Sequence, residues 1–163
     1  MQATSLTQRK HTLNVLWVAM AGAVSSYWFV HLVLLHRPVA AITSSAFPEA
    51  LIAGSAVCYT GAWWWHGRTI RSVGSLIDPT MFMRLSPQDR VGLQDRLQNA
   101  AVVCLALFES PAVLGLINTM VQAPAPHLFE WLAGASLVFL LTFRLQGYPA
   151  IFDMLEKLDP GSR

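Results

Sequence analysis

Residues 97–121 read LQNAAVVCLALFESPAVLGLINTMV, an apolar run that contains a single acid. About 20 apolar residues span the hydrocarbon core of a bilayer, so this run is long enough to cross one. Upstream, Ser86, Pro87 and Asp89 supply a helix cap, a first-turn proline and an acid near the positive helix end. The pattern predicts one helix from about Pro87 to Met120, with a polar first part that projects from the membrane.

Three further apolar blocks, at residues 13–35, 48–66 and 128–146, have a similar character. Hydrophobic residues make up 54% of the chain and charged residues 12%, with a mean hydropathy of +0.45. Soluble domains carry roughly a quarter charged residues, so this chain is depleted in charge. The sequence predicts an all-α fold: a four-transmembrane-helix bundle that forms a single integral membrane domain over residues 1–163.

The first block has a signal peptide as its alternative interpretation, because Arg9 and Lys10 precede it. Its apolar run is longer than the apolar region of a signal peptide, which favours an uncleaved helix.

The positive charges predict the orientation. Cytoplasmic segments of membrane proteins carry an excess of Lys and Arg. Ten such residues lie in the N-terminal segment, in the loop 67–96, or in the tail 147–163 and the helix end before it. They are Arg9, Lys10, Arg68, Arg71, Arg84, Arg90, Arg96, Arg144, Lys157 and Arg163. The opposite side holds Arg37 alone. Both termini are therefore expected in the cytoplasm, and the protein in a bacterial cytoplasmic (inner) membrane.

Two short segments on the cytoplasmic side have the pattern of interfacial helices. Ile70, Val73 and Ile77 recur at helical spacing after the second block, until Asp78-Pro79 ends the pattern. In the tail, Pro149 opens a segment with one apolar face, formed by Ile151, Phe152, Leu155 and Leu158. Such helices commonly lie flat on a membrane, so we expect anchoring, with partner recognition as the alternative.

Glu109 is the candidate functional residue. An ionisable group at bilayer depth is costly unless it is paired, hydrated or protonated, which makes it a functional hypothesis by default. Pro111 cannot donate a hydrogen bond to the carbonyl of Leu107, and this freed carbonyl needs another partner. Ser110 adds a hydroxyl beside the acid. The three residues Glu109, Ser110 and Pro111 form the candidate ion or proton site.

The other predicted helices carry polar groups at a similar depth, which are candidate partners for the Glu109 carboxyl: Ser25, Ser26, Tyr27, Ser55, Tyr59, Thr60 and Ser136. The second block also carries small residues at four-residue intervals: Ala50, Gly54, Cys58 and Ala62. Small residues let membrane helices approach closely. We expect this stripe to receive a helix of the same chain, with a homo-oligomer interface as the alternative.

Several classes of function find no support in the sequence. Cys58 and Cys104 lie in apolar blocks and are interpreted as small buried hydrophobic residues. His31, His36 and His127 lie towards the outer face without the spacing of metal ligands, and His31 is expected to be a satisfied polar group. No nucleophile has a base at a recognisable spacing. We therefore expect no enzyme, no cofactor, no metal and no nucleic-acid partner; the expected partner is the lipid bilayer.

The stretch LALFESPAVLGLI, residues 105–117, resembles the carboxylate helix of rotary ATP synthase c subunits. The resemblance implies that Glu109 binds a proton or sodium ion and that Ser110 is an accessory ligand. It is local: here the acid lies on the third of four helices, and the helices lack that family's repeated glycines.

The whole chain is similar to a group of small, uncharacterised bacterial four-helix membrane proteins with Glu-x-Pro-Ala-x-x-Gly-Leu in the third helix. The motif is matched by Glu109, Pro111, Ala112, Gly115 and Leu116, and Pro149 matches a proline after the fourth helix. This resemblance implies the architecture and brings no established activity with it.

Three functional hypotheses remain open. The first is an interaction or assembly protein that uses Glu109 as a buried polar lock, with another copy or another membrane protein as partner. The second is a proton- or cation-handling protein in which Glu109 titrates. The third is a lipid- or small-molecule-binding bundle, which would need a cavity beside Glu109.

Overall fold

The computed structural model describes residues 6–35, 46–121, 127–146 and 148–158, which form helices and contain no strand. The helices are α1 (Leu6–Leu35), α2 (Ala46–Ile77), α3 (Pro79–Arg84), α4 (Pro87–Met120), α5 (Leu128–Gln146) and α6 (Tyr148–Leu158). The expected all-α fold is confirmed. His36, Arg37 and Arg163 lie outside the described residues, as do the side chains of Ile77 and Pro149.

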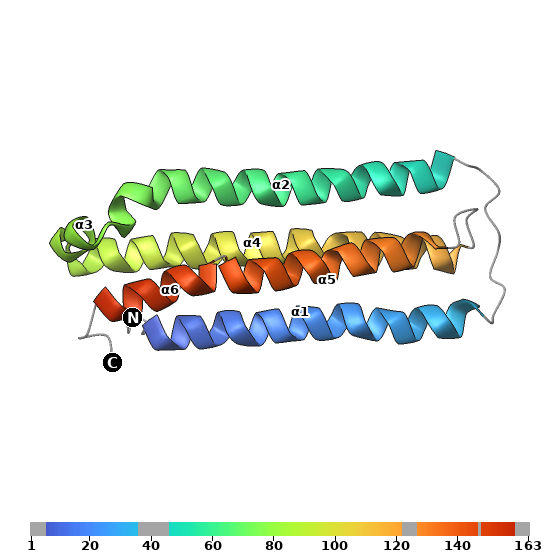
Figure 1. Ribbon diagram of the computed structural model, residues 1–163, viewed down its shortest axis with the longest axis horizontal. Coiled ribbons are helices and arrows are strands. Elements are labelled where there is room, and N and C mark those ends of the chain that lie inside the picture. The colour runs from blue at the N-terminus through green and yellow to red at the C-terminus, as the bar shows by residue number, and fades with distance from the viewer. Residues whose placement is uncertain (1–5, 36–45, 122–126, 147, 159–163) are drawn as a thin grey trace.

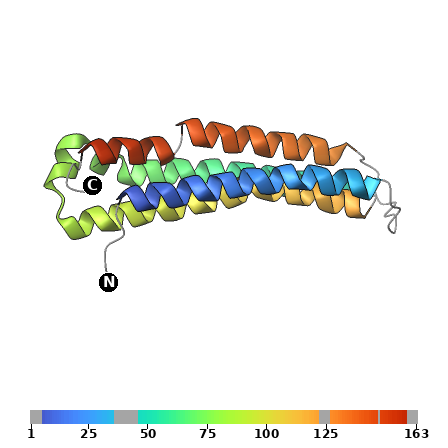
Figure 2. The same cartoon turned by 90° about the horizontal axis from the view of Figure 1, so that it is seen from below.

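Helix α4 is the centre of the bundle, because α1, α2 and α5 all pack against it. Figure 1 shows α2 and α1 on opposite sides of α4 and α5, with α1 and α4 running in one direction and α2 and α5 in the other. Figure 2 shows α5 and α6 following one another along one side of the bundle. The buried positions of α4 recur every three or four residues, as one face of a helix requires; they include Leu93, Leu97, Ala101, Cys104, Leu105, Phe108, Ala112 and Gly115.

Two of the described helices, α1 and α4, are long and apolar enough to cross a membrane by their length and composition. The span in α1 covers Leu6–Val33, and the span in α4 covers Pro87–Met120. The surface of α1 is largely unburied within the bundle, whereas α4 has almost half of its most apolar window buried. The two helices therefore differ in how much of their surface remains for a surrounding medium.

One end of the bundle brings together the start of α1, the end of α2, the start of α4, and the short helices α3 and α6 (Figure 1). We call it the basic end, because it carries Arg9, Lys10, Arg68, Arg71 and Arg84, together with Arg90, Arg96 and Lys157. The opposite end, which we call the far end, contains the start of α2, the end of α4 and the start of α5.

The segment expected as a loop at residues 67–96 is mostly helical. Helix α2 continues without interruption to Ile77, so Ile70 and Val73 belong to it and form no separate interfacial helix; Val73 is buried in the bundle. Asp78 then caps α3 by accepting hydrogen bonds from the backbone of Thr80 and Met81. Ser86 caps α4 in the same way, by accepting from the Asp89 backbone, as its sequence predicts.

The tail helix α6 corrects a second expectation. Its apolar face does not lie free for a membrane, because Phe152 and Leu155 are fully buried against the bundle and Ile151 and Leu158 pack against the same core. At the start of α6, Tyr148 is also buried, and this burial raises the pKa of its hydroxyl. An amphipathic pattern is satisfied equally well by a protein surface and by a membrane, and here the protein supplies it.

Candidate functional site

Glu109 lies on α4 and is half-buried. The Tyr27 hydroxyl on α1 donates a hydrogen bond to Glu109 Oε1, with 2.8 Å between the two oxygens. Pro111, which follows two residues later, is buried inside α4. The carboxyl therefore has a partner on the neighbouring helix, and the bond links α1 to α4 between the middles of these helices and the far end.

Most of the other predicted partners use their hydroxyls on their own helix. Ser25, Ser26 and Thr60 are exposed and donate to the backbone carbonyls of Ala21, Gly22 and Ala56, respectively. Ser110 does the same with the Ala106 carbonyl, at 2.8 Å. A serine or threonine in a helix readily bonds the carbonyl four residues earlier. These four hydroxyls therefore do not join Tyr27 at the carboxyl.

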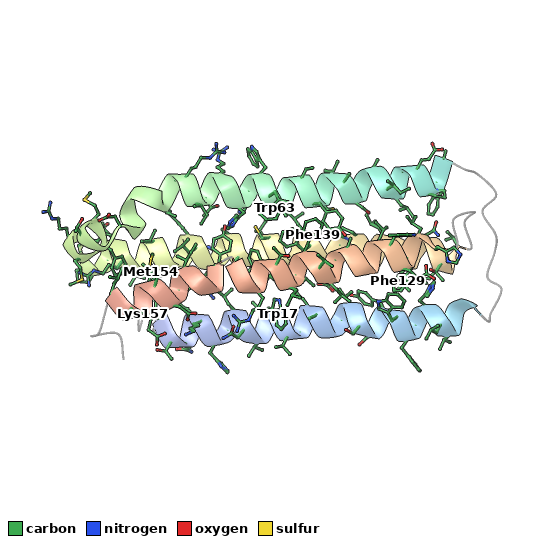
Figure 3. The ribbon with its side chains drawn as sticks, in the orientation of Figure 1. Trp17, Trp63, Phe129, Phe139, Met154 and Lys157 are labelled. Carbon is green, nitrogen blue, oxygen red and sulfur yellow. The ribbon has the colours of Figure 1, made fainter. Side chains whose placement is uncertain are left out.

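Tyr59 and Ser136 form a separate polar contact between α2 and α5. The Tyr59 hydroxyl lies 3.2 Å from both the Leu132 carbonyl oxygen and Ser136 Oγ. The Tyr59 ring packs on Phe139, which also contacts Trp63. Figure 3 labels Phe139 and Trp63, which face one another between the helices. Ser55 is buried on α2 but donates to its own Leu51 carbonyl. Among the hydroxyls expected at one depth, those of Tyr27, Tyr59 and Ser136 make contacts between helices. The others bond carbonyls of their own helix.

The stripe of small residues on α2 faces α4 of the same chain at two positions. Ala62 is fully buried, and the Cys104 thiol donates to its carbonyl with 3.5 Å between the atoms. Gly54 lies against Leu114, whose Cδ1 would be 3.5 Å from a Cβ at that position. Ala50 is exposed and Cys58 is half-buried. Close approach by small residues therefore positions α2 against α4.

A second polar cluster lies at the far end and joins three helices; we call it the far-end cluster. Its centre is His31 on α1, whose side chain is 1% exposed. The Nδ1 atom of His31 lies 2.9 Å from Thr119 Oγ1 on α4, and Nε2 lies 3.2 Å from Glu130 Oε1 on α5. The imidazole stacks on the Phe129 ring, with 4.4 Å between ring centroids. Figure 3 shows Phe129 near the far end of α5, beside α1.

The far-end cluster reaches the protein surface through Glu130. The Glu130 side chain is 33% exposed, and its Oε1 lies 3.6 Å from Nδ1 of His127, which is 81% exposed. The other carboxyl oxygen, Oε2, is buried and has no hydrogen-bond partner among the described residues. The cluster therefore runs from an exposed histidine through a carboxyl to a buried histidine.

Sequence reasoning treated His31 as a satisfied polar group but did not find its partners. Glu130 attracts little attention because it lies near a helix end, where acids are common. Glu130 can be identified by its position along the bundle axis. Helices α1 and α4 end at the far end and α5 begins there, so His31, Thr119 and Glu130 lie at similar levels. A search for polar residues at matched depths on all helices, extended beyond the level of Glu109, would have grouped them.

The basic end is joined by ion pairs. Arg9, only 5% exposed, pairs with Asp95 on α4 and also donates to Gln98 Oε1 at 3.1 Å. Lys10 pairs with Asp153 and, at 3.2 Å, with Glu156, both on α6. These contacts fix the start of α1 against α4 and α6.

An apolar groove of about 510 Å³ follows the exposed side of α5. It is lined by Glu130, Trp131, Gly134, Ala135, Val138 and Phe139. The groove therefore lies beside the far-end cluster, and the carboxyl at its edge is Glu130, not Glu109.

Comparison of the chain with protein-family models, curated proteins and solved structures found no match.

Proposed function

We propose that the protein crosses the membrane four times, through α1, α2, α4 and α5. Large apolar side chains are exposed on all four helices: Val18, Phe29, Ile52, Val57, Val113, Ile117, Trp131, Val138 and Leu141. Water-soluble monomers rarely expose contiguous apolar surface of this extent, whereas lipid covers it favourably. Meanwhile His31, Ser55, Thr119 and Ser136 are buried. Buried polar side chains together with an apolar exterior support a lipid environment.

The lengths of α2 and α5 agree with this proposal. Between Glu49 and Arg68, α2 carries no charged residue, and neither does α5 between Glu130 and Arg144. Helix α5 has 19 residues, which at 1.5 Å per residue gives about 28 Å, close to the thickness of a hydrocarbon core. The exposed Trp64 and the Arg68 guanidinium, 5.3 Å from its ring, suit the interface.

The positive charges at the basic end support a cytoplasmic location for that end. Cysteine labelling tests this topology in whole cells, in a Cys58→Ser, Cys104→Ser background. We expect a membrane-impermeant maleimide to label Val121→Cys at the far end, and to label Ser86→Cys at the basic end only after lysis. Labelling of Ser86→Cys in intact cells would contradict the orientation, and equal labelling of both sites would contradict the four crossings.

Within this membrane bundle, we propose that the protein serves in interaction or assembly and that Glu109 acts as a polar lock. The hydrogen bond from Tyr27 to Glu109 carries the proposal, because it gives a costly intramembrane carboxyl a partner inside the chain. A role in assembly is supported by α2, which packs on α4, on α3 and, through Tyr59, on α5, and still leaves Ile52, Val57 and Trp64 exposed. Such a face is available to a second copy or to another membrane protein.

The Glu109→Gln variant tests the lock. The glutamine carbonyl can still accept the Tyr27 hydrogen bond but cannot release a proton. We expect Glu109→Gln to retain the thermal stability and assembly state of the wild type, and Glu109→Ala to lose stability. In proteoliposomes, both variants should leave proton permeability unchanged.

Proton or cation handling is the alternative, favoured by the partial exposure of the Glu109 side chain. It predicts that a hydrophobic carbodiimide modifies Glu109 and that Glu109→Gln abolishes both the labelling and a proton flux seen with the wild type. That result would replace the lock as the role of this residue.

The assembly role is tested separately, by crosslinking from a photoreactive amino acid placed on α2. At the exposed Val57 we expect a crosslinked dimer or a crosslink to another membrane protein in native membranes. The buried Ala62 is the control, because a probe there faces the inside of the same chain. Absence of any protein crosslink from Val57 would contradict assembly through this face.

A further inference from the structure

The far-end cluster has a property that the Tyr27–Glu109 pair lacks: both ring nitrogens of its histidine face groups that can donate or accept a hydrogen bond. We propose that His31 and Glu130 form a proton-binding site that exchanges protons with the medium at the far end. The proposal does not depend on the role of Glu109.

The first step is the environment of His31. Its imidazole is 1% exposed, and its ring nitrogens face two different helices. A buried imidazole with an unpaired nitrogen is destabilising, because the buried group loses its hydrogen bonds to water and gains none in their place. Here Nδ1 faces a hydroxyl, which can donate or accept, and Nε2 faces a carboxyl, which can do the same when protonated.

The second step is that Thr119 can serve both forms of the imidazole. When Nδ1 bears a proton it donates to Thr119 Oγ1, and the threonine hydroxyl then donates to the Gly115 carbonyl, 3.4 Å away. When Nδ1 is unprotonated, the same hydroxyl turns and donates to it. No buried group loses its partner in either case, so the surroundings allow the ring to gain a proton without rearrangement of the helices.

The third step is access. The proton enters through Glu130, whose side chain is 33% exposed and whose buried Oε2 has no hydrogen-bond partner among the described residues. A proton from the medium first binds the Glu130 carboxylate and forms its O–H bond, while Nδ1 carries the proton of the neutral ring. That O–H bond then breaks and an N–H bond forms at Nε2. The products are a carboxylate and an imidazolium 3.2 Å apart. The net change is the uptake of one proton from the medium.

The ionisable groups around His31 come from two helices and the turn before α5. Helix α5 contributes Glu130, His127 precedes it, and α1 contributes Tyr27, one turn away. Helix α4 faces the ring with the uncharged Thr119. An imidazolium here therefore meets one carboxylate at close range, while a charged His127, 3.6 Å from the same carboxyl, competes for it.

The experiment is a pH titration of ¹⁵N-histidine-labelled protein in lipid nanodiscs, followed by NMR between pH 5 and 8. The His31 signal is assigned with His31→Gln, and the exposed His11 at the opposite end serves as the internal reference. We expect His31 to take up one proton reversibly in this range, with unchanged helix content by circular dichroism. A His31 signal that stays unprotonated in the folded protein, or that changes only as the protein unfolds, would overturn the proposal.

The role of Glu130 is tested in the same titration. Glu130→Gln keeps an oxygen near Nε2 but removes the negative charge, so proton binding by His31 should weaken about tenfold or more. The matched control is Glu49→Gln, which removes an exposed carboxyl from α2 at the same end and should change it less than twofold. If Glu130→Gln also leaves proton binding unchanged, the carboxyl is no part of the site and the proposal fails. If Glu130→Gln unfolds, the wild-type titration still decides.

Discussion

Two polar contacts of α1 with α4, away from the basic end, differ in depth and in construction. Nearer the middle, Tyr27 donates one hydrogen bond to Glu109, and both side chains are half-buried. At the far end, the buried His31 is bonded at both ring nitrogens, to Thr119 on α4 and to Glu130 on α5. The middle pair can hold two helices together, whereas the far-end cluster joins three helices and can exchange a proton. A lone acid in an apolar run is easier to notice in the sequence, but the far-end cluster contains more hydrogen-bonding groups and a histidine that can bind a proton.

The largest expected effect concerns the close approach of α4 and α5 at Gly115, near the far end. A Cβ at Gly115 would lie 2.9 Å from the backbone of Phe129 and 3.3 Å from Leu132, so Gly115→Ala forces α4 and α5 apart. We expect a loss of about 2–3 kcal/mol in the free energy of unfolding. Gly134→Ala is the control, because nothing lies within 4 Å of its Cβ. Equal stabilities of the two variants, measured by unfolding in lipid bicelles, would contradict the close approach.

A smaller loss is expected when the far-end cluster loses its central group. His31→Ala leaves Thr119 and Glu130 without their partner, and buried unpaired groups cost about 1–3 kcal/mol. His127→Ala removes a side chain that is 81% exposed and should change stability by less than about 0.5 kcal/mol. Tyr27→Phe in the middle pair gives the second comparison. We expect it to lower the free energy of unfolding by about 0.6 kcal/mol, which is typical of a hydrogen bond between membrane helices. A larger loss from Tyr27→Phe than from His31→Ala would reverse the ranking of the two sites.

The smallest effect concerns pH at the basic end. The hydroxyl and backbone amide of Thr80 hold the pKa of Asp78 below its usual value. A carboxyl with a depressed pKa stabilises the folded state above its unfolded pKa, and this stability is lost as pH falls. We therefore expect faster hydrogen exchange in α3 below about pH 4, without unfolding of the bundle. Asp78→Asn keeps a capping oxygen and should remove this pH dependence; an unchanged dependence would exclude Asp78 as its source.

The sequence predicted the helices well where the pattern was long and marked by caps. Helix α4 begins after Ser86 and ends at Met120, as expected, because a cap, a first-turn proline and a sustained apolar run all agree there. The two amphipathic segments, at residues 70–77 and in the tail, were wrongly assigned to the membrane surface, since an amphipathic face does not say what will cover it. Val73 and Phe152 are buried by the bundle itself.

The candidate site was predictable only in part. Glu109 stood out because an acid is costly in an apolar run, and Tyr27 was among its expected partners. Ser25 and Thr60 were at the right depth but on the wrong face, and single-sequence reasoning does not resolve helix rotation. The far-end cluster required the pairing of residues 88 and 99 positions apart, which depends on how the helices are arranged.

The most direct test of the polar lock is a double-mutant cycle on its two residues. Tyr27→Phe, Glu109→Leu and the double variant are compared with the wild type by reversible unfolding in lipid bicelles. If the hydrogen bond joins α1 to α4, the losses are not additive, and the coupling free energy is about 0.5–1.7 kcal/mol. Additive losses, with a coupling free energy near zero, would show that Tyr27 and Glu109 act independently and would contradict the lock.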